Sequence, residues 1–224
     1  MIVALIPAHD EAPRIAAVIA AARRHLPVLV VDDGSSDATS EIARAAGATV
    51  IEQRPNQGKG AALRTGFRRA IADGADAILT LDADGQHDPA EIPKLLAAAS
   101  ATPPPDLVIG ARRFRTMPPM RRLSNELGRR AFSWAVGRDI PDNQSGFRLV
   151  SRRLAEATLA SDQHGFAFEV EQITTCIRMG GTIGWVPIRT IYAGAPSHIR
   201  PLAHLREFIA IVRQARRDVR RPIG

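Results

Sequence analysis

Cysteine, lysine, tyrosine and tryptophan are scarce in this chain of 224 residues. The single cysteine, Cys176, excludes a disulfide framework and any metal cluster built from several cysteines. One tyrosine and two tryptophans leave few rings for stacking bases, so we expect no nucleic-acid partner. Lysine occurs only at Lys59 and Lys94, and 28 of the 30 basic residues are therefore arginine.

Long hydrophobic runs are also missing. No apolar stretch approaches the ~18 residues of a membrane-spanning segment, so we expect no transmembrane helix. The apolar run Ile2–Pro7 has no basic segment before it, which predicts a strand rather than a signal peptide. Hydrophobic residues make up 45% of the chain and charged residues 24%, a composition typical of a soluble globular domain.

The net charge of +7 is unevenly divided along the chain. Residues 1–111 carry 10 Lys/Arg and 14 Asp/Glu, a net charge of −4, whereas residues 112–224 carry 20 and 9, a net charge of +11. A coding bias toward arginine accounts for the scarcity of lysine but accounts less well for this asymmetry. The asymmetry predicts an acidic first half that holds a metal ion and a basic second half that meets an anionic partner.

Apolar runs alternate with helical patterns through the first half. The expected strands are Ile2–Pro7, Val28–Asp33, Ala48–Glu52, Ala77–Asp82 and Asp106–Ala111. The expected helices are Glu11–His25, Asp37–Ala46, Gly58–Asp73 and Pro89–Ser100. Continuously apolar strands separated by helices predict an α/β fold with a Rossmann-like, mostly parallel central sheet and helices on both faces.

The second half is less regular. Its expected helices are Arg121–Val136, Ser151–Leu159, Phe166–Met179 and Leu202–Val219. Asp142–Phe147 is expected to be a polar loop, and Thr182–Ile191 a strand that Pro187 places at an edge or a bulge. The last helix has an apolar face and an arginine face, so it would lie on the core, on a partner subunit or on anionic lipid.

The motif with the clearest chemistry is Asp82-Ala83-Asp84, at the end of the fourth expected strand. Two carboxylates one residue apart can converge on one hard divalent cation, Mg²⁺ or Mn²⁺. Gln86 would add a neutral oxygen, and Gly85 would let the backbone turn closely around the ion. A solvated acidic turn is the alternative interpretation.

Two further segments of the first half carry polar side chains suited to a nucleotide. Asp33 can accept hydrogen bonds from a base or a ribose, whereas its neighbours Ser36 and Asp37 are explained as a helix cap. Lys59, in the glycine-rich segment Asn56–Ala62, can contact a phosphate or ribose, and the same segment can simply begin a helix.

The basic half offers separate anion-binding candidates. Arg112 and Arg148 can each form paired hydrogen bonds to a phosphate, although a solvated surface arginine is the alternative for both. His198 can bind phosphate when protonated, act as an acid or base, or be an ordinary loop histidine.

Taken in order, these motifs resemble the family 2 glycosyltransferases with the GT-A (nucleotide-diphospho-sugar transferase) fold. Within them, the dolichol-phosphate mannose synthase and polyprenyl-phosphate glycosyltransferase group is the most similar. The motifs that carry the resemblance are Ile6–Glu11, Val31–Ser35, Asn56–Ala62, Asp82–Pro89, Gly110–Arg112, Ser145–Arg148, Phe168–Glu171 and Val186–Ile188. His9 stands where the family usually has a tyrosine, and the late Tyr-x-x-x-Ser-Lys pattern is altered to Tyr192 followed by Ser197-His198.

The resemblance implies a metal-dependent, inverting transfer of a sugar from a UDP- or GDP-linked donor. The implied donor-binding residues are Pro7, His9, Glu11, Val31, Asp33, Lys59, Asp82, Ala83 and Asp84. The implied ligands of Mg²⁺ or Mn²⁺ are Asp82, Asp84 and Gln86, and the implied catalytic residues are Asp84, Arg112 and Arg148.

The resemblance also makes a polyprenyl phosphate the expected acceptor. The implied acceptor or phosphate contacts are Arg112, Ser145, Arg148 and His198. A phosphate acceptor is already anionic, so it needs positioning more than it needs a base. A hydroxyl acceptor of a glycan or lipid is the alternative; it would need a carboxylate base, for which Asp142 and Glu169 are candidates.

We expect residues 1–201 to form one domain, with a nucleotide-sugar and metal half at 1–111 and an acceptor half at 112–201. The amphipathic basic helix within 202–224 would follow, and residues 202–221 would contact a membrane surface or a membrane-protein partner. We expect a cytoplasmic protein, peripheral on the inner face of the plasma membrane, that works in cell-envelope glycan biosynthesis.

Two other classes of function stay open. A sugar nucleotidyltransferase would carry a Gly-x-Gly-Thr-Arg loop after the first strand, where Pro7–Glu11 stands instead. A non-catalytic protein would bind anions or a membrane through its basic half alone.

Overall fold

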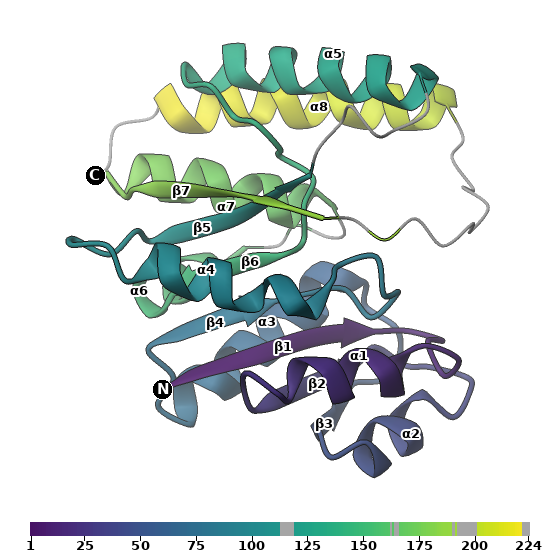
Figure 1. The fold of residues 1–224 in the computed structure, drawn as a ribbon. Coiled ribbons are helices and arrows are strands. Elements are labelled where there is room, and N and C mark those ends of the chain that lie inside the picture. Colours follow the sequence, from purple (N-terminus) through teal and green to yellow (C-terminus); the bar gives the residue numbers. More distant parts are fainter. Residues whose placement is uncertain (113–118, 162, 164–165, 190, 192–200, 221–224) are drawn as a thin grey trace.

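The computed structural model describes residues 1–112, 119–161, 163, 166–189, 191 and 201–220, with only the backbone of 119–125, 166, 201–208 and 220. These residues form a seven-stranded sheet in the order β3-β2-β1-β4-β6-β5-β7 (Figure 1). The strands are β1 Ile2–Ala8, β2 Val28–Asp32, β3 Thr49–Glu52, β4 Ala77–Thr80, β5 Leu107–Arg112, β6 Arg148–Ser151 and β7 Ile183–Ile188.

The sheet is mostly parallel, as predicted. Strand β1 pairs in parallel with β2 and β4, β2 with β3, and β5 with β7. Strand β6 is the exception, because it lies antiparallel between β4 and β5. The sequence does not predict β6, since its four residues follow a polar loop directly and lead straight into a helix. Pro187 lies in β7, at the edge of the sheet, where a residue without an N–H is tolerated.

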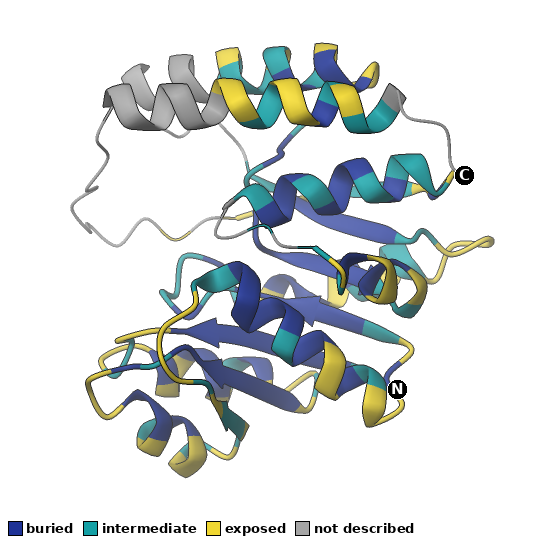
Figure 2. Ribbon diagram, turned by 180° about the vertical axis from the view of Figure 1, so that it is seen from behind, coloured by how far each residue is buried: buried dark blue, intermediate teal, exposed yellow. Residues whose placement is uncertain are grey.

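Helices cover both faces of the sheet. They are α1 Ile15–Ala22, α2 Thr39–Ala45, α3 Lys59–Ala72, the 3-10 turn η1 Pro89–Glu91, α4 Ile92–Ala99, α5 Pro119–Val136, α6 Arg152–Thr158, α7 Phe166–Arg178 and α8 Pro201–Arg220. Helices α1, α2 and α4 share one buried apolar cluster with the strands, and α3, α5, α6, α7 and α8 share the other. Figure 2 shows the central strands buried between these layers, whereas the edge strands β3 and β7 are more exposed.

Strand β1 shows why both faces can be filled. Its side chains alternate, so Leu5 belongs to one cluster and Ile6 to the other, and neither is exposed to solvent. Each such side chain contributes ~1.5–3 kcal/mol on burial. Helix α3 lies close to the strand because Gly66 has no side chain; a Cβ there would lie 2.2 Å from Leu5 Cδ1. The start of α3, with its Gly58 and Lys59, is thereby fixed beside the end of β1.

The C-terminal helix α8 packs against α5 and α7. Ala215 is buried there, and Ile211 and Val219 pack on the same cluster. The helix was expected to lie on the core, on a partner subunit or on anionic lipid. In the structure, one of its faces lies on the core. Among the described residues, no helix is long and apolar enough to span a membrane.

Candidate active site

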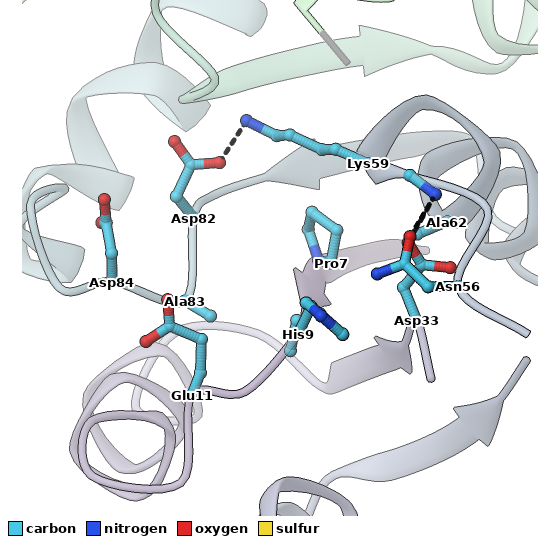
Figure 3. Close-up of a pocket in the computed structure, with 12 residues that line it drawn as sticks. Pro7, His9, Glu11, Asp33, Asn56, Lys59, Ala62, Asp82, Ala83 and Asp84 are labelled. Atoms are coloured by element: carbon cyan, nitrogen blue, oxygen red, sulfur yellow. Dashed lines mark hydrogen bonds and ion pairs between the residues drawn. The ribbon is translucent and has the colours of Figure 1, made fainter. Parts of the chain in front are cut away.

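A pocket of about 400 Å³ opens at the carboxyl ends of β1, β2 and β4, where the fold class places ligands. Its lining residues are Pro7, Ala8, His9, Glu11, Asp33, Asn56, Gly58, Lys59, Ala62, Asp82, Ala83 and Asp84 (Figure 3). All the residues that the sequence predicts to bind the donor line this pocket, except Val31. Val31 is fully buried in the core and does not line the pocket, so the structure adds no support for its predicted contact with the donor.

Asp33 organises the side of the pocket next to the loop before α3. Its carboxylate accepts hydrogen bonds from the backbone N–H groups of Gln57 at 2.8 Å and Gly58 at 2.7 Å, and from Gln53 Nε2 at 2.6 Å. Gly58 has a φ of +86°, a left-handed conformation that favours glycine. Asp33 therefore holds the loop before α3 against the end of β2.

His9 and Glu11 line the opposite wall, on the loop after β1. The His9 side chain is 45% exposed, and the residue lines the pocket. Glu11 is held by Arg14, whose Nε donates to Glu11 Oε2 at 2.7 Å. The loop itself is anchored to the start of α2, because Glu11 N donates to Thr39 Oγ1 at 2.8 Å.

Lys59, Asp82 and Glu169 form an ion cluster in which Glu169 is buried and the other two side chains are partly exposed. Lys59 Nζ lies 2.5 Å from Asp82 Oδ1 and 2.8 Å from Glu169 Oε1. Burial alone would lower the pKa of Lys59, but the two carboxylates outweigh burial and raise it. Burial would likewise raise the pKa of Asp82, but Lys59 outweighs it and lowers that pKa to about 2. Lys59 and Asp82 are therefore both charged at neutral pH, and the lysine does not face the pocket unpaired.

Asp84 lies outside this cluster and lines the pocket. It accepts hydrogen bonds from the backbone N–H of Gln86 at 2.9 Å and from Gln86 Nε2 at 2.7 Å. Gly85, with a φ of +74°, makes the tight turn between them. Gln86 orients Asp84 through its amide nitrogen, and its amide oxygen stays the predicted metal ligand.

The metal prediction can be tested against the donor set. Asp82 and Asp84 offer carboxylate oxygens on either side of Ala83, which suits Mg²⁺ or Mn²⁺. Within the described part of the chain, no three His, Cys, Asp or Glu side chains gather to hold a metal ion. The two aspartates therefore fit a cation that takes further oxygens from its substrate or from water.

His87, which was not among the predicted site residues, supports the loop that carries Asp82 and Asp84. Its Nδ1 accepts a hydrogen bond from the backbone N–H of Asp82 at 3.2 Å, and its ring lies 5.4 Å from that of Phe147. Burial lowers the pKa of His87, so the ring is neutral and can accept. The sequence feature that could have indicated this role is the position of His87 within the Asp82–Pro89 motif.

Arg112, at the end of β5, pairs with Asp142. Arg112 Nε lies 2.8 Å from Asp142 Oδ2, and Arg112 Nη2 lies 3.0 Å from Oδ1. Burial would raise the pKa of Asp142, but the bonds from Arg112 outweigh it and lower the pKa. Asp142 and Glu169, the two candidate bases, are thus both committed to ion pairs.

Arg148 and Ser145 are not surface anion contacts. Arg148 is 1% exposed, and it donates to the carbonyl oxygens of Ser145 at 2.7 Å, Glu169 at 2.5 Å and Asn143 at 3.3 Å. Ser145 is itself fully buried. The structure therefore gives the predicted phosphate contacts at both positions no support, because Arg148 ties the loop before β6 to α7. His198 lies outside the described residues.

Residues 3–159 match the family model for glycosyl transferase family 2. The chain belongs to this family. It is 38% identical over 184 residues to the glycosyltransferase AglJ of Haloferax volcanii, covering 79% of this chain and 58% of that protein. It is 30% identical to an undecaprenyl-phosphate mannosyltransferase of Micrococcus luteus, covering 84% of this chain and 82% of that protein.

Another relative is a UDP-N-acetylglucosamine--dolichyl-phosphate N-acetylglucosaminyltransferase of Methanococcus voltae, 30% identical with 86% of each chain covered. Among solved structures, the family 2 chain is similar to glucosyl-3-phosphoglycerate synthase from Mycobacterium tuberculosis in complex with Mn²⁺, UDP and phosphoglyceric acid. That match has a TM-score of 0.74 at 24% identity and covers 96% of this chain and 78% of the other.

These matches confirm the GT-A fold and the resemblance to polyprenyl-phosphate glycosyltransferases. The chain is a family 2 glycosyltransferase, which replaces the nucleotidyltransferase and binding-protein alternatives.

Proposed function

We propose that this glycosyltransferase moves a sugar from a UDP- or GDP-linked donor to a polyprenyl phosphate. The observation that carries the proposal is that Arg112 acts on Asp82, lowering its pKa, while the two candidate bases Asp142 and Glu169 are already held in ion pairs. The Micrococcus luteus and Methanococcus voltae relatives, whose names specify polyprenyl phosphate acceptors, support it.

The donor's nucleoside would lie between the loops after β1 and β2. His9, with its exposed ring, would stack on the base, and Asp33 would face the ribose while holding the loop that contains Gly58. Pro7 and Ala62 supply apolar walls beneath the sugar ring of the nucleoside. These contacts position the donor without taking part in bond breaking.

Asp82 and Asp84 would hold Mg²⁺ or Mn²⁺, whose chemistry is to neutralise the charge that develops on the leaving nucleoside diphosphate. The residues of the chain prepare the two carboxylates for this task. His87 fixes the backbone at Asp82, and Gln86 fixes the carboxylate of Asp84. Lys59 keeps Asp82 ionised through its ion pair.

The state of the candidate bases favours a phosphate acceptor over a hydroxyl acceptor. A hydroxyl must lose a proton as it attacks, and the lowered pKa of Asp142 makes that group a poor proton acceptor. A phosphate monoester needs no such transfer and requires a cation that aligns it. Arg112, oriented by Asp142 through two hydrogen bonds, is the group that we assign to this alignment. A single displacement would invert the anomeric carbon.

Transfer can be measured directly. The protein is incubated with Mn²⁺, a polyprenyl phosphate and each radiolabelled UDP- or GDP-sugar, and we expect label in the organic phase with one donor class. Asp84→Asn should lower transfer at least 100-fold, whereas Asp73→Asn, which changes an exposed carboxylate on a distant helix end, should not. Label on a polyprenol but not on its phosphate would contradict the proposed acceptor, and no transfer to either would contradict the function.

A further inference from the structure

Helices α5 and α8 present an open apolar surface at the end of the molecule opposite β3 and α2 (Figure 1). Of the five large hydrophobic residues that the described part of the chain exposes, three lie here: Leu127 at 59%, Trp134 at 66% and Ile209 at 40%. Between the helices runs a groove of about 350 Å³. Its lining residues are Ala131, Trp134, Ile209, Val212, Arg213 and Arg216.

This surface is separate from the face by which the helices pack on the core. On α5, Phe132 and Val136 are buried, and on α8 Ala215 is buried in the same cluster. Leu127, Ala131 and Trp134 follow one another at helical spacings of four and three residues, on the outer side. Figure 2 shows exposed residues along the outer side of both helices. The described helices therefore carry a second apolar stripe that the fold leaves uncovered.

Arginines surround this stripe. Arg216 Cζ lies 3.6 Å from the centroid of the Trp134 ring, a cation–π contact that joins the two helices. The described side chains of 126–139 and 209–219 include six arginines and three acidic residues. Two of those acids, Glu126 and Asp139, are bound by Arg129. The third, Asp218, accepts hydrogen bonds from Gln214.

We propose that the α5–α8 surface docks on an anionic lipid bilayer. A tryptophan capped by a guanidinium suits the headgroup region, because the ring enters the apolar boundary while the charge stays with lipid phosphates. A purely apolar protein partner would instead desolvate the arginines without neutralising them. The inference rests on the proposed function, because the proposed acceptor, a polyprenyl phosphate, is held in a membrane.

The chain connects this surface to the acceptor side of the site. Helix α5 is the next described element after β5, whose last residue is Arg112, and α8 follows β7, the parallel neighbour of β5. Docking through α5 and α8 would therefore bring the acceptor half, rather than the α1–α2 edge, toward the lipid.

Vesicle sedimentation tests the charge requirement. Full-length protein is mixed with vesicles of phosphatidylglycerol and phosphatidylcholine, or of phosphatidylcholine alone, at low and high salt. We expect binding to the anionic vesicles, weakened by salt, and at least a tenfold loss of affinity in Arg213→Glu/Arg217→Glu. The control Arg24→Glu/Arg152→Glu makes the same charge change outside α5 and α8, at one exposed and one partly exposed arginine, and should bind like the wild type. Equal binding of both double variants, or no preference for anionic vesicles, would overturn the proposal.

Tryptophan fluorescence tests the apolar contact. Trp185→Phe leaves Trp134 as the only tryptophan of the chain. We expect a blue shift and protection from acrylamide when anionic vesicles are added to this variant. An unchanged spectrum would overturn the proposal, as would a blue shift that depends on protein concentration without vesicles, because that outcome identifies a second copy of the chain as the occupant.

The two proposals can fail separately. Transfer to a short-chain polyprenyl phosphate dissolved in detergent should be the same for wild type and Arg213→Glu/Arg217→Glu, since neither arginine lines the donor pocket. Vesicle binding without any transfer would contradict the enzyme's proposed acceptor and leave the docking surface supported. Circular dichroism and thermal unfolding confirm that each variant is folded before these comparisons.

Discussion

Lys59 and Glu169 stand 110 positions apart in the sequence, and Lys59 Nζ donates to Glu169 Oε1 at 2.8 Å. The same ammonium group contacts Asp82 Oδ1 at 2.5 Å. One lysine at the start of α3 thus links the strand end that carries the paired aspartates to α7 of the acceptor half. It supplies positive charge at the position where a divalent cation would meet Asp82.

Removing this charge should strengthen metal binding by the free protein. In Lys59→Met, Asp82 and Glu169 lose their shared cation, so we expect Mn²⁺ to bind at least threefold more tightly in the absence of nucleotide. Isothermal titration calorimetry measures this affinity. Lys94→Met is a matched control, because Lys94 is the other lysine and pairs with Glu91 away from the pocket. Unchanged or weaker Mn²⁺ binding in Lys59→Met would show that the lysine does not compete with the cation.

Gly146 should be intolerant of a side chain. A Cβ at this position would lie 2.8 Å from Glu169 Oε1 and 2.9 Å from both Asp82 Oδ1 and Lys59 Nζ. We expect Gly146→Ala to destabilise the protein by ~1–3 kcal/mol in urea unfolding, as overpacking does, and to lower activity further. In Gly184→Ala the new Cβ would meet its nearest neighbour at 3.5 Å, an ordinary contact, so that variant should unfold like the wild type.

Stability should fall at acid pH through the ion-paired aspartates Asp82 and Asp142. The folded-state pKa of Asp82 is lowered from 3.8 to about 2, so its ionised form stabilises the fold fully above pH ~4. That contribution is lost as pH falls from ~4 toward ~2, and the lowered pKa of Asp142 adds to the same trend. Urea unfolding of the wild type and Asp82→Asn at several pH values measures it. The difference between them should shrink across this range, and a constant difference would contradict the assignment.

Substitutions at Arg148 and Arg112, the two arginines predicted to bind phosphate, should have different effects on stability and activity. Arg148→Met would leave three buried carbonyl oxygens without their donor, so we expect a loss of at least ~3 kcal/mol of stability. Arg112→Lys keeps the charge beside Asp142 but loses the paired geometry, so we expect a smaller stability loss and at least a tenfold fall in kcat/KM for the acceptor. Equal stability losses with unchanged kinetics in Arg112→Lys would remove that residue from the acceptor site.

Local patterns in the sequence predict the parallel strands and the residues at their carboxyl ends. Asp33, Asp82 and Asp84 follow apolar runs, and parallel pairing then brings such ends together. The roles of Arg148 and Asp142 could not be predicted, because their partners are set by β6, a strand of four residues without a distinctive pattern. An arginine that binds carbonyl oxygens in the core has the same sequence appearance as one that binds a phosphate.

Strand β6 also determines how the chain could be divided. It comes from the second half of the sequence, yet it separates β4 from β5, both of which come from the first half. A fragment ending near residue 111 would carry β5 without either of its hydrogen-bonded neighbours and would leave one edge of β4 bare. The donor and acceptor halves therefore cannot be exchanged between relatives as blocks. A chimera that changes the acceptor would have to keep β6 matched to β4 and β5 and alter the segments beyond it.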